Sequence, residues 1–290
     1  MSRVLPYRHE GVATAPRAVA SSRTSYATRS RARRFFRWCA SLVLASSLTG
    51  CGALQLYTPE DDMQLGLQAY DEIVGEEPLI TSGPQYDMVQ RATGRLVEAA
   101  KRMGPEFTQR FEWEVRLIDN PDVVNAFCLP GGKMAVYTGI LPVAQTETGL
   151  AVVMGHEIAH ATERHGTERM SRAQLEELVV QAGVTAAGGD ELHAEAARGA
   201  LQLAVNLPFS RRDELEADQV GLLYMAAAGY DPREAERFWG RMSALSGGGG
   251  SSLEAFLSTH PTDQDRIAQI RELLPEAMRL YEASEAVGNP

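Results

Sequence analysis

The sequence is poor in cysteine and in aromatic residues. It has three cysteines among 290 residues, and only 7% of its residues are Phe, Trp or Tyr. Beyond position 50 only Cys51 and Cys128 remain. Cys51 ends a string, described below, that is typical of lipid attachment. A lipid on Cys51 would leave Cys128 without a partner, so we expect no structural disulfide.

Long hydrophobic runs are also absent after residue 50. No apolar stretch there approaches the roughly 18 residues that a membrane-spanning helix needs, so we do not expect a membrane-embedded enzyme. A 34-residue repeat, the mark of a helical-repeat tail, is missing as well. The length that remains, positions 51–290, suits one domain.

The N-terminal fifty residues almost lack acids. They hold nine arginines and a single acid, Glu10, and an apolar run from Trp38 to Leu48 follows the arginines. That run is too short to span a bilayer and is typical of a secretory signal. It ends in Leu48-Thr49-Gly50-Cys51, which resembles the bacterial lipobox, where the cysteine becomes lipidated. An ordinary signal peptide with an incidental Cys51 is the alternative.

These features predict three regions. Residues 1–50 are a signal peptide that is removed, 51–58 a lipidated tether, and 59–290 a single domain. Gly52 in place of Asp after the cysteine fits sorting to the outer membrane of a Gram-negative bacterium, on its periplasmic side. Removing residues 1–50 leaves 19 basic and 37 acidic residues, a net charge of −18. This charge argues against nucleic acid as a partner, and membrane attachment must come from the lipid.

The string from Gly155 to Ala161 reads Gly-His-Glu-Ile-Ala-His-Ala. In a helix, His156 and His160 leave the same face one turn apart, so one metal ion can bind both rings. Glu157 then lies where it can reach a water molecule on that metal, and H-E-x-x-H is the signature of zinc peptidases. The surrounding residues are apolar, which predicts a buried helix that ends near Gly166. Two ordinary helix histidines with other partners are the alternative.

A third ligand must come from elsewhere in the chain. His165 lies about 140° round the helix from His160, on the wrong face. Cys128 is possible, although thiolates are less common in hydrolytic zinc sites. Glu214 is the strongest candidate, because it shares a helix face with Asp218, which can orient a ligating imidazole from behind. Glu216 is the competing choice, and a solvated acidic helix start is the alternative to both.

Several separated motifs together resemble the HtpX-like zinc metalloendopeptidases, a gluzincin family with BepA-, LoiP- and Oma-type members. The family pairs H-E-x-x-H with a later E-x-x-x-D, and here these motifs fall on His156, Glu157, His160, Glu214 and Asp218. The similarity runs from about Asn125 to Arg266. It also covers 125–132, 163–166, 208–211, 228–232 and 258–267.

The resemblance implies zinc as the cofactor, with His156, His160 and Glu214 as ligands and Asp218 behind them. Glu157 would take the proton from water during peptide hydrolysis. His260 would point into the site, where it either steadies the transition state or occupies the open zinc position. A plain helix start is the alternative for His260. The strand that carries Asn125, Ala126 and Phe127 would offer its backbone edge to an extended peptide; a merely buttressing sheet is the other interpretation.

The expected fold class is α+β and mostly helical, a zincin-type metalloprotease domain with a small antiparallel sheet beside the active-site helix. We expect strands at 111–118, 123–127 and 134–137, with Gly-rich loops at 184–190 and 246–252. The expected helices besides the metal helix are 59–74, 84–103, 171–183, 191–206, 210–228, 232–245, 262–273 and 275–286.

The predicted function is that of a membrane-anchored periplasmic zinc endopeptidase. Its substrates would be unfolded or misassembled envelope polypeptides, and envelope assembly machinery is a possible partner. A zinc-containing chaperone or assembly lipoprotein without proteolytic activity is the rival hypothesis. The intact Glu157 argues against that rival, since only catalysis requires a general base there. A lipid-binding carrier without a metal is a third and weaker hypothesis.

Overall fold

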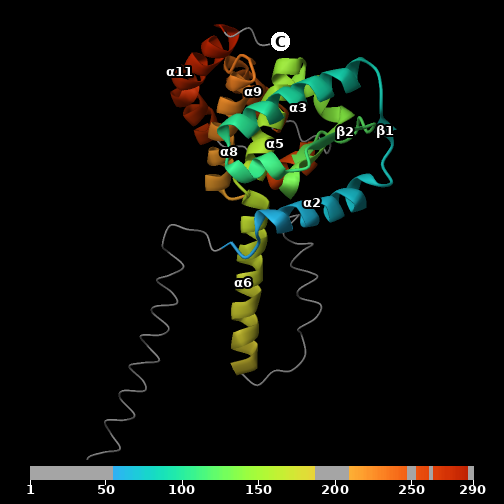
Figure 1. Cartoon of the computed structure of the whole chain (residues 1–290), viewed down its shortest axis with the longest axis vertical. Coiled ribbons are helices and arrows are strands. Elements are labelled where there is room, and N and C mark those ends of the chain that lie inside the picture. The colour runs from blue at the N-terminus through green and yellow to red at the C-terminus, as the bar shows by residue number, and fades with distance from the viewer. Residues whose placement is uncertain (1–54, 187–208, 247–252, 261–263, 287–290) are drawn as a thin grey trace, which may run out of the picture. The chain divides into compact units, whose positions relative to one another are not determined.

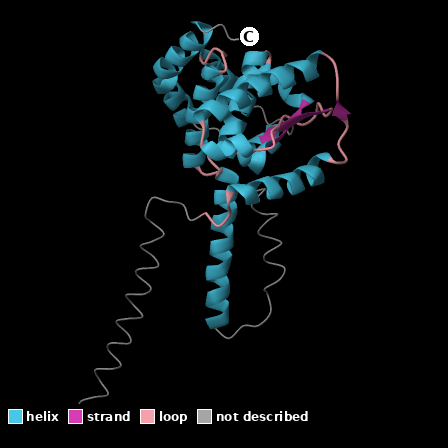
Figure 2. Ribbon diagram, viewed as in Figure 1, coloured by secondary structure: helices cyan, strands magenta, loops and turns pink. Residues whose placement is uncertain are grey.

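Helices make up most of the computed structural model, which describes residues 55–186, 209–246, 253–260 and 264–286. All of them belong to one compact unit, Ala53–Pro290. Figures 1 and 2 show helices around a small sheet, which confirms the predicted α+β class. The longer elements are α2 (Pro59–Val74), α3 (Pro84–Met103), α5 (Glu147–Thr162), α6 (His165–Ala186), α8 (Arg211–Ala227), α9 (Arg233–Ser246) and α11 (Gln264–Ala286). The shorter helices are η1 (Glu106–Arg110), η2 (Pro130–Gly132), η3 (Thr138–Ile140), α4 (Leu141–Ala144) and α10 (Glu254–Thr259).

The sheet is mixed, whereas the sequence analysis predicted an antiparallel one. Its order is β1 (Leu79–Ile80), β2 (Glu114–Ile118), β4 (Lys133–Tyr137) and β3 (Ala126–Cys128). The two central strands β2 and β4 run parallel, and the edge strands β1 and β3 pair antiparallel with them. The antiparallel prediction was wrong because β3 does not lie between its sequence neighbours. The chain places it beyond β4, next to the helix that carries the histidines.

Local sequence signals explain where the main helices begin. Thr58 caps α2, and its side chain and that of Asp61 bond reciprocally to each other's backbone N–H groups. Ser210 and Asp213 form the same capping box at the start of α8. Such boxes satisfy N–H groups that have no partner inside the helix. The predicted bounds 59–74 and 84–103 are confirmed, and 210–228 and 232–245 are correct to within a residue at each end.

Helix α5 forms the centre of the domain. Its residues from Gly149 to Thr162 are all buried, in agreement with the predicted buried helix. The prediction that it ends at Gly166 was wrong. It ends at Thr162, because Arg164 adopts a left-handed conformation (φ 61°) and turns the chain into α6 at His165. Gly166 therefore lies in the first turn of the next helix.

Two glycines let α5 and α8 pack closely. A Cβ atom at Gly221 would lie 2.7 Å from the backbone C of Gly155 and the backbone N of His156. Real side chains do not approach a backbone so closely, so the glycine at 221 sets the separation of the two helices. This separation brings the first turns of α8 against the histidine face of α5.

The C-terminal region differs from its prediction in one respect. Instead of two helices broken near position 274, α11 is continuous and contains Pro275. Packing on α8 and α9, with Ile270 and Ala277 buried, holds the helix together across the missing proline N–H. The predicted helix 191–206 lies outside the described residues, as do positions 187–190 and 247–252 of the two predicted Gly-rich loops. Positions 184–186, predicted as loop, belong instead to the end of α6. No helix in the described part of the chain has the length and hydropathy needed to cross a bilayer.

Candidate metal centre

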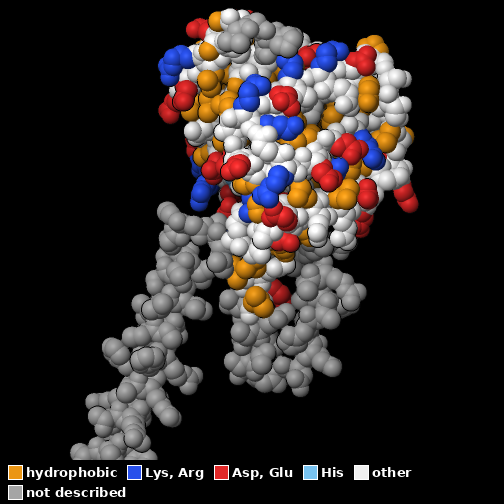
Figure 3. Space-filling view, in the orientation of Figure 1, with side chains coloured by type: hydrophobic (Ala, Val, Ile, Leu, Met, Phe, Trp, Pro, Cys, Tyr) orange, Lys and Arg blue, Asp and Glu red, His pale blue; other side chains and the backbone are white. Residues whose placement is uncertain are grey.

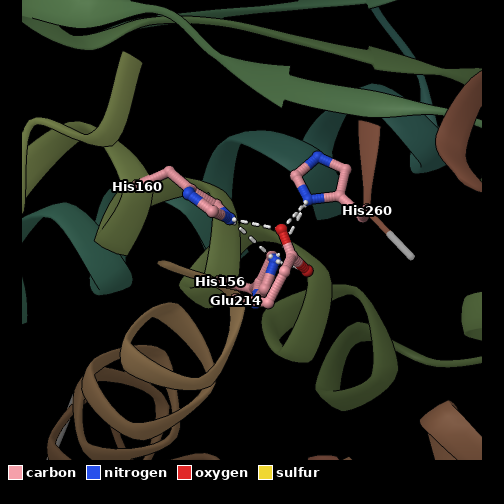
Figure 4. Close-up of side chains that lie close together, drawn as sticks. All are labelled: His156, His160, Glu214 and His260. Carbon is pink, nitrogen blue, oxygen red and sulfur yellow. Dashed lines mark hydrogen bonds and ion pairs between the residues drawn. The ribbon is translucent and has the colours of Figure 1, made fainter. Parts of the chain in front are cut away.

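Four buried side chains from three parts of the chain meet at one point. His156 and His160 come from α5, Glu214 from the first turn of α8, and His260 from the end of α10. One nitrogen or oxygen atom of each lies within 4.8 Å of the others, and Figure 4 shows the three rings arranged around the Glu214 carboxylate. Two or three imidazoles with a carboxylate are a ligand set typical of zinc. This group can therefore hold a metal ion.

The imidazole of His156 is held from behind by Asp218. The Nδ1 of His156 lies 3.0 Å from Oδ1 of Asp218, one turn along α8 from Glu214. Arg266 of α11 in turn holds the carboxylate, with Nε 2.6 Å from Oδ2 and Nη2 2.7 Å from Oδ1. Its Nη1 also lies 2.8 Å from Oε2 of Glu214. One buried guanidinium thus fixes both carboxylates against α5.

A second imidazole supports His160 in the same way. The Nδ1 of His165 lies 2.9 Å from the Nδ1 of His160, and both rings are buried. One of these two nitrogens donates a proton and the other accepts it. Across the ring, Nε2 of His165 lies 3.6 Å from Oε2 of Glu216. The Phe209 ring stacks on His160 with its centroid 3.9 Å away, so the plane of that imidazole is fixed on two sides.

The contacts at Nδ1 leave the two Nε2 atoms facing each other at 3.0 Å. When Nδ1 of His156 donates to Asp218, its Nε2 carries a lone pair, and the same holds for His160 when its Nδ1 donates to His165. The Glu214 carboxylate lies 3.4 to 3.5 Å from both Nε2 atoms. With both rings neutral, three acceptors converge, and a metal ion between them takes the place of the proton that His156 otherwise carries. The donor set therefore fits a metal ion.

Burial and neighbouring charges separate the pKa values of these groups. Burial alone would lower the pKa of His156, but the carboxylates of Asp218 and Glu214 outweigh it and raise the pKa to about 9. The pKa of His160 falls well below its ordinary value, because the ring is buried and charged His156 is beside it. Burial would also raise the pKa of Glu214, yet the three surrounding imidazoles hold it well below its usual range.

Glu157 lies beside the convergent group, defined as His156, His160, Glu214 and His260, but is not part of it. Its side chain is buried, and its Oε1 is 3.4 Å from Nε2 of His260. It also accepts a backbone hydrogen bond from Cys128 of β3. Burial raises the pKa of Glu157 above its ordinary value, although the charges of His260 and His156 oppose that rise. A carboxylate in this setting can accept a proton near neutral pH.

A cavity of about 330 Å³ opens next to these residues. The three residues predicted to bind substrate, Asn125, Ala126 and Phe127, line it together with Glu157 and His260. They lie at the start of β3, which among the described residues pairs with β4 alone and so forms an edge of the sheet. The structure thus brings all three next to the metal centre; whether they bind substrate stays a prediction.

Two rival ligands from the sequence lie outside the convergent group. The Glu216 side chain is 39% exposed and faces His165 and Arg212. Cys128 lines the cavity, but within the described residues it is not part of the four-residue group. Cys51 lies outside the described residues.

Sequence reasoning assigned no role to His165 or Arg266. His165 was considered only as a ligand and rejected by its helical angle, whereas a new helix begins at this residue. Arg266 falls within a family motif, but nothing local marks it as buried. One feature of the sequence does predict a buried cation such as Arg266. The predicted site gathers three acids, Glu157, Glu214 and Asp218, and these need a positive charge besides the metal.

The fold and the site together define a zincin-like metallopeptidase. A sequence model of peptidase family M48 matches residues 86–274, more than half of the chain, so the protein belongs to this family of zinc-dependent metallopeptidases.

The matching relatives include eukaryotic and bacterial proteases. The mitochondrial metalloendopeptidase OMA1 of Schizosaccharomyces pombe is 37% identical over 227 residues, covering 77% of this chain and 64% of its own. The human metalloendopeptidase OMA1 is 30% identical over 253 residues, with 82% and 47% covered. A putative beta-barrel assembly-enhancing protease of Vibrio cholerae is 35% identical over 206 residues, with 68% and 40% covered. The chain thus spans less than two thirds of the length of these three relatives.

Proposed function

We propose that this protein is a zinc-dependent endopeptidase that hydrolyses peptide bonds of unfolded or misassembled polypeptides. The observation that carries the proposal is the convergence of buried His156, His160 and Glu214 with buried Glu157 beside them. Glu157 and His160 line the adjacent cavity. The names of the relatives, metalloendopeptidases and assembly-enhancing proteases, support the same class of reaction.

In this proposal His156, His160 and Glu214 hold the metal, and Asp218 orients the His156 ring. When bound, zinc would polarise the scissile carbonyl and lower the pKa of a water molecule from about 15.7 towards about 7. Glu157 accepts the proton from water and passes it to the leaving amine. The raised pKa of Glu157 suits a group that must both take and return a proton.

The edge of β3 is the proposed substrate track. Asn125 and Leu129 form backbone hydrogen bonds with β4, so by alternation the backbone groups of Ala126 and Cys128 point away from β4, where the Cys128 N–H bonds to Glu157. The Ala126 N–H is held there by Oδ1 of Asn125 at 2.9 Å. An extended peptide pairing along this edge would bring its backbone past Glu157, and contacts through the backbone alone give weak sequence preference. That property suits an enzyme that acts on unfolded chains.

His260 is proposed to regulate the site. Its Nδ1 lies 3.0 Å from Oε1 of Glu214 and 3.3 Å from Nε2 of His156. This position favours the interpretation of His260 as a fourth ligand that holds the enzyme latent over that of a transition-state stabiliser. Activation would require that the end of α10 move away from the site. The Gly-rich run 247–250, which precedes α10 and which we propose as the hinge for this movement, lies outside the described residues.

The proposed location is the periplasm of a Gram-negative bacterium, with a lipid on Cys51 as the anchor to the outer membrane. The lipobox-like string Leu48–Cys51 and the basic segment before it support this assignment. Envelope assembly machinery is the proposed partner, by analogy with the assembly-enhancing relatives. The location is tested separately from the activity.

The decisive variant for the activity is Glu157→Gln. It keeps the size of the side chain and leaves the three metal ligands in place, but the amide cannot accept the proton. We expect one zinc per chain in both proteins, casein cleavage by the wild type, and a loss of at least about a hundredfold in the variant. Zinc is measured by plasma mass spectrometry and cleavage by peptide release. Wild-type cleavage rates in the zinc-loaded variant would remove Glu157 from the mechanism. If the zinc-loaded wild type and a zinc-loaded His260→Ala variant both cleave nothing, latency is excluded and the chaperone hypothesis is favoured.

A further inference from the structure

A second groove lies at the opposite edge of the sheet from the metal centre. It has a volume of about 540 Å³ and lies between α3 and strands β1 and β2, which Figure 1 shows next to one another. None of its lining residues lines the cavity beside Glu157. Because the strand order is β1-β2-β4-β3, the two cavities belong to different sheet edges. The mechanism proposed above makes no use of this groove.

The backbone of β2 is only partly covered on this side. Strand β1 ends at Ile80, opposite Leu117 of β2. The backbone groups that point towards β1 are those of the odd-numbered residues of β2. Backbone groups point to alternate sides along a strand. The N–H and C=O groups of Val115 therefore point to the same side as those of Leu117, beyond the end of β1. Within the described residues no strand lies opposite Val115 there. The side chain of Gln90 holds the Val115 carbonyl at 3.1 Å, so a new strand would have to pair through the N–H of Val115.

Apolar and polar side chains line the groove in similar measure, and one of the polar groups has no partner among the described residues. The apolar lining comes from Ile80, Tyr86, Val97, Trp113, Val115 and Met134. Thr93 is 2% exposed and lines the groove, and its Oγ1 has no hydrogen-bond partner among the described residues. A buried hydroxyl costs free energy unless it is paired. A ligand that brings both an apolar side chain and a polar backbone group would satisfy this site.

A glycine keeps the groove open. Gly94 lies in the interior of α3, where glycine costs roughly 1 kcal/mol relative to alanine. A Cβ atom at this position would meet nothing within 4 Å, so close packing does not require glycine here. Gly94 lines the groove, and a larger side chain would fill the entrance.

The charges at the rim already pair with one another. Lys101 lies 3.2 Å from Glu98, and Arg116 lies 2.9 Å from Glu114. Figure 3 likewise shows acidic and basic side chains interspersed on this face of the domain. A rim without net charge favours an uncharged occupant over a charged one.

We infer that this groove docks an extended, uncharged segment of polypeptide. The segment adds to the free edge of β2 by pairing with Val115, and one of its β-branched or apolar side chains enters the groove beside Thr93 and Gly94. The docked chain lies away from the metal centre, so the groove captures part of a long substrate while another part is cleaved. The inference rests on the proposed function only in treating this polypeptide as a substrate.

Hydrogen exchange tests the docking without any need for catalysis. The full-length chain carrying Glu157→Gln is mixed with an uncharged ten-residue peptide of alternating valine and threonine, and exchange over residues 111–118 is followed by mass spectrometry. We expect the peptide to slow exchange there. Adding Gly94→Phe should abolish the protection, whereas Gly240→Phe should retain it, because Gly240 of α9 has an equally open position but does not line the groove.

Unchanged exchange over 111–118, or protection that survives Gly94→Phe, would contradict the docking inference. Thermal unfolding checks that the variant folds, and Gly94→Leu replaces it if the larger ring does not. In the active enzyme, Gly94→Phe should raise KM for casein by about tenfold, or about 1.4 kcal/mol of docking. The kcat/KM for a short peptide should not change. If neither the wild type nor His260→Ala cleaves either substrate, the proposed function is refuted, while the exchange result would still decide the docking.

Discussion

At the scale of single residues, His156 and His160 are chemically unlike although they lie one helical turn apart. Asp218 and Arg266 stand behind His156, and neutral His165 stands behind His160. Without a metal, therefore, His156 is protonated and charged at neutral pH, whereas His160 is neutral. The outer contacts of a metal site commonly fix the tautomer and basicity of its ligands in this manner.

Zinc affinity should depend on pH through that proton. In the metal-free protein the pKa of His156 is about 9, above its ordinary value of 6.5. Protonation of His156 thus stabilises the metal-free fold below about pH 6.5, and this contribution is lost as the pH rises through about 9. Zinc must displace the same proton, so its apparent affinity should rise about tenfold per pH unit from about 6.5 to about 9. Competition with a chelator at three pH values measures this; a flat profile would contradict it.

The variant His260→Ala tests whether His260 regulates the enzyme or is needed to bind the metal. His260→Ala leaves His156, His160 and Glu214 in place, so the zinc content should stay at one per chain. Because His260 is proposed to hold the enzyme latent, the basal rate of casein cleavage should rise; a fall would assign His260 to transition-state stabilisation instead. A cleavage rate equal to that of the wild type would reject any role of His260 in activity.

At the scale of helices, the closeness of α5 and α8 decides whether the ligands meet. The two helices touch at Gly155 and Gly221, and Glu214 lies two turns before that contact. Because helix backbones are stiff, a small change in their spacing moves the Glu214 carboxylate away from both imidazoles. The glycines are therefore part of the metal site although they carry no ligand.

The variant Gly221→Ala tests this dependence on spacing. Its Cβ would lie 2.7 Å from the backbone of Gly155 and His156, so the helices must move apart. We expect a loss of about 1–3 kcal/mol in the free energy of unfolding, together with weaker zinc binding. Gly240→Ala is the matched control, because its Cβ meets nothing within 4 Å, and it should stabilise the fold by up to about 1 kcal/mol. Urea unfolding and zinc titration compare the two. Equal effects would show that spacing is not the cause.

Much of the helical map could be predicted because its signals are local. Thr58-Pro59 and Ser210 with Asp213 mark helix starts within a few residues of chain. The errors arise where distant packing decides. The parallel pairing of β2 with β4 depends on where β3 goes, and Pro275 stays helical only because α11 packs along its length. The spacing in H-E-x-x-H predicted the histidine face, whereas the support from His165 and Arg266 required knowledge of which elements pack together.

At the scale of the whole molecule, the proposed lipid decides where the catalytic domain acts. Residues 51–290 carry a net charge of −18, which repels anionic membrane surfaces. A lipid on Cys51 would overcome that repulsion and hold the domain near its substrates, since several acyl chains together give stable anchoring.

Changing Cys51 tests the anchor without touching the fold of the domain. We expect the full-length chain expressed in a Gram-negative bacterium to incorporate labelled palmitate and to sediment with outer membranes. Cys51→Ala should lose the label and leave the outer-membrane fraction. Cys128→Ala is the control and should retain both properties, because Cys128 lies in the domain. Labelling that persists in Cys51→Ala would refute the lipobox assignment.

The central claim is that one zinc ion is bound by His156, His160 and Glu214. The most direct measurement is anomalous X-ray scattering at the zinc absorption edge from crystals of the zinc-loaded protein. The account predicts a single strong peak per chain, about 2.0–2.2 Å from Nε2 of both histidines and from a carboxylate oxygen of Glu214. The absence of a peak there, or a peak bound by other residues, would contradict it.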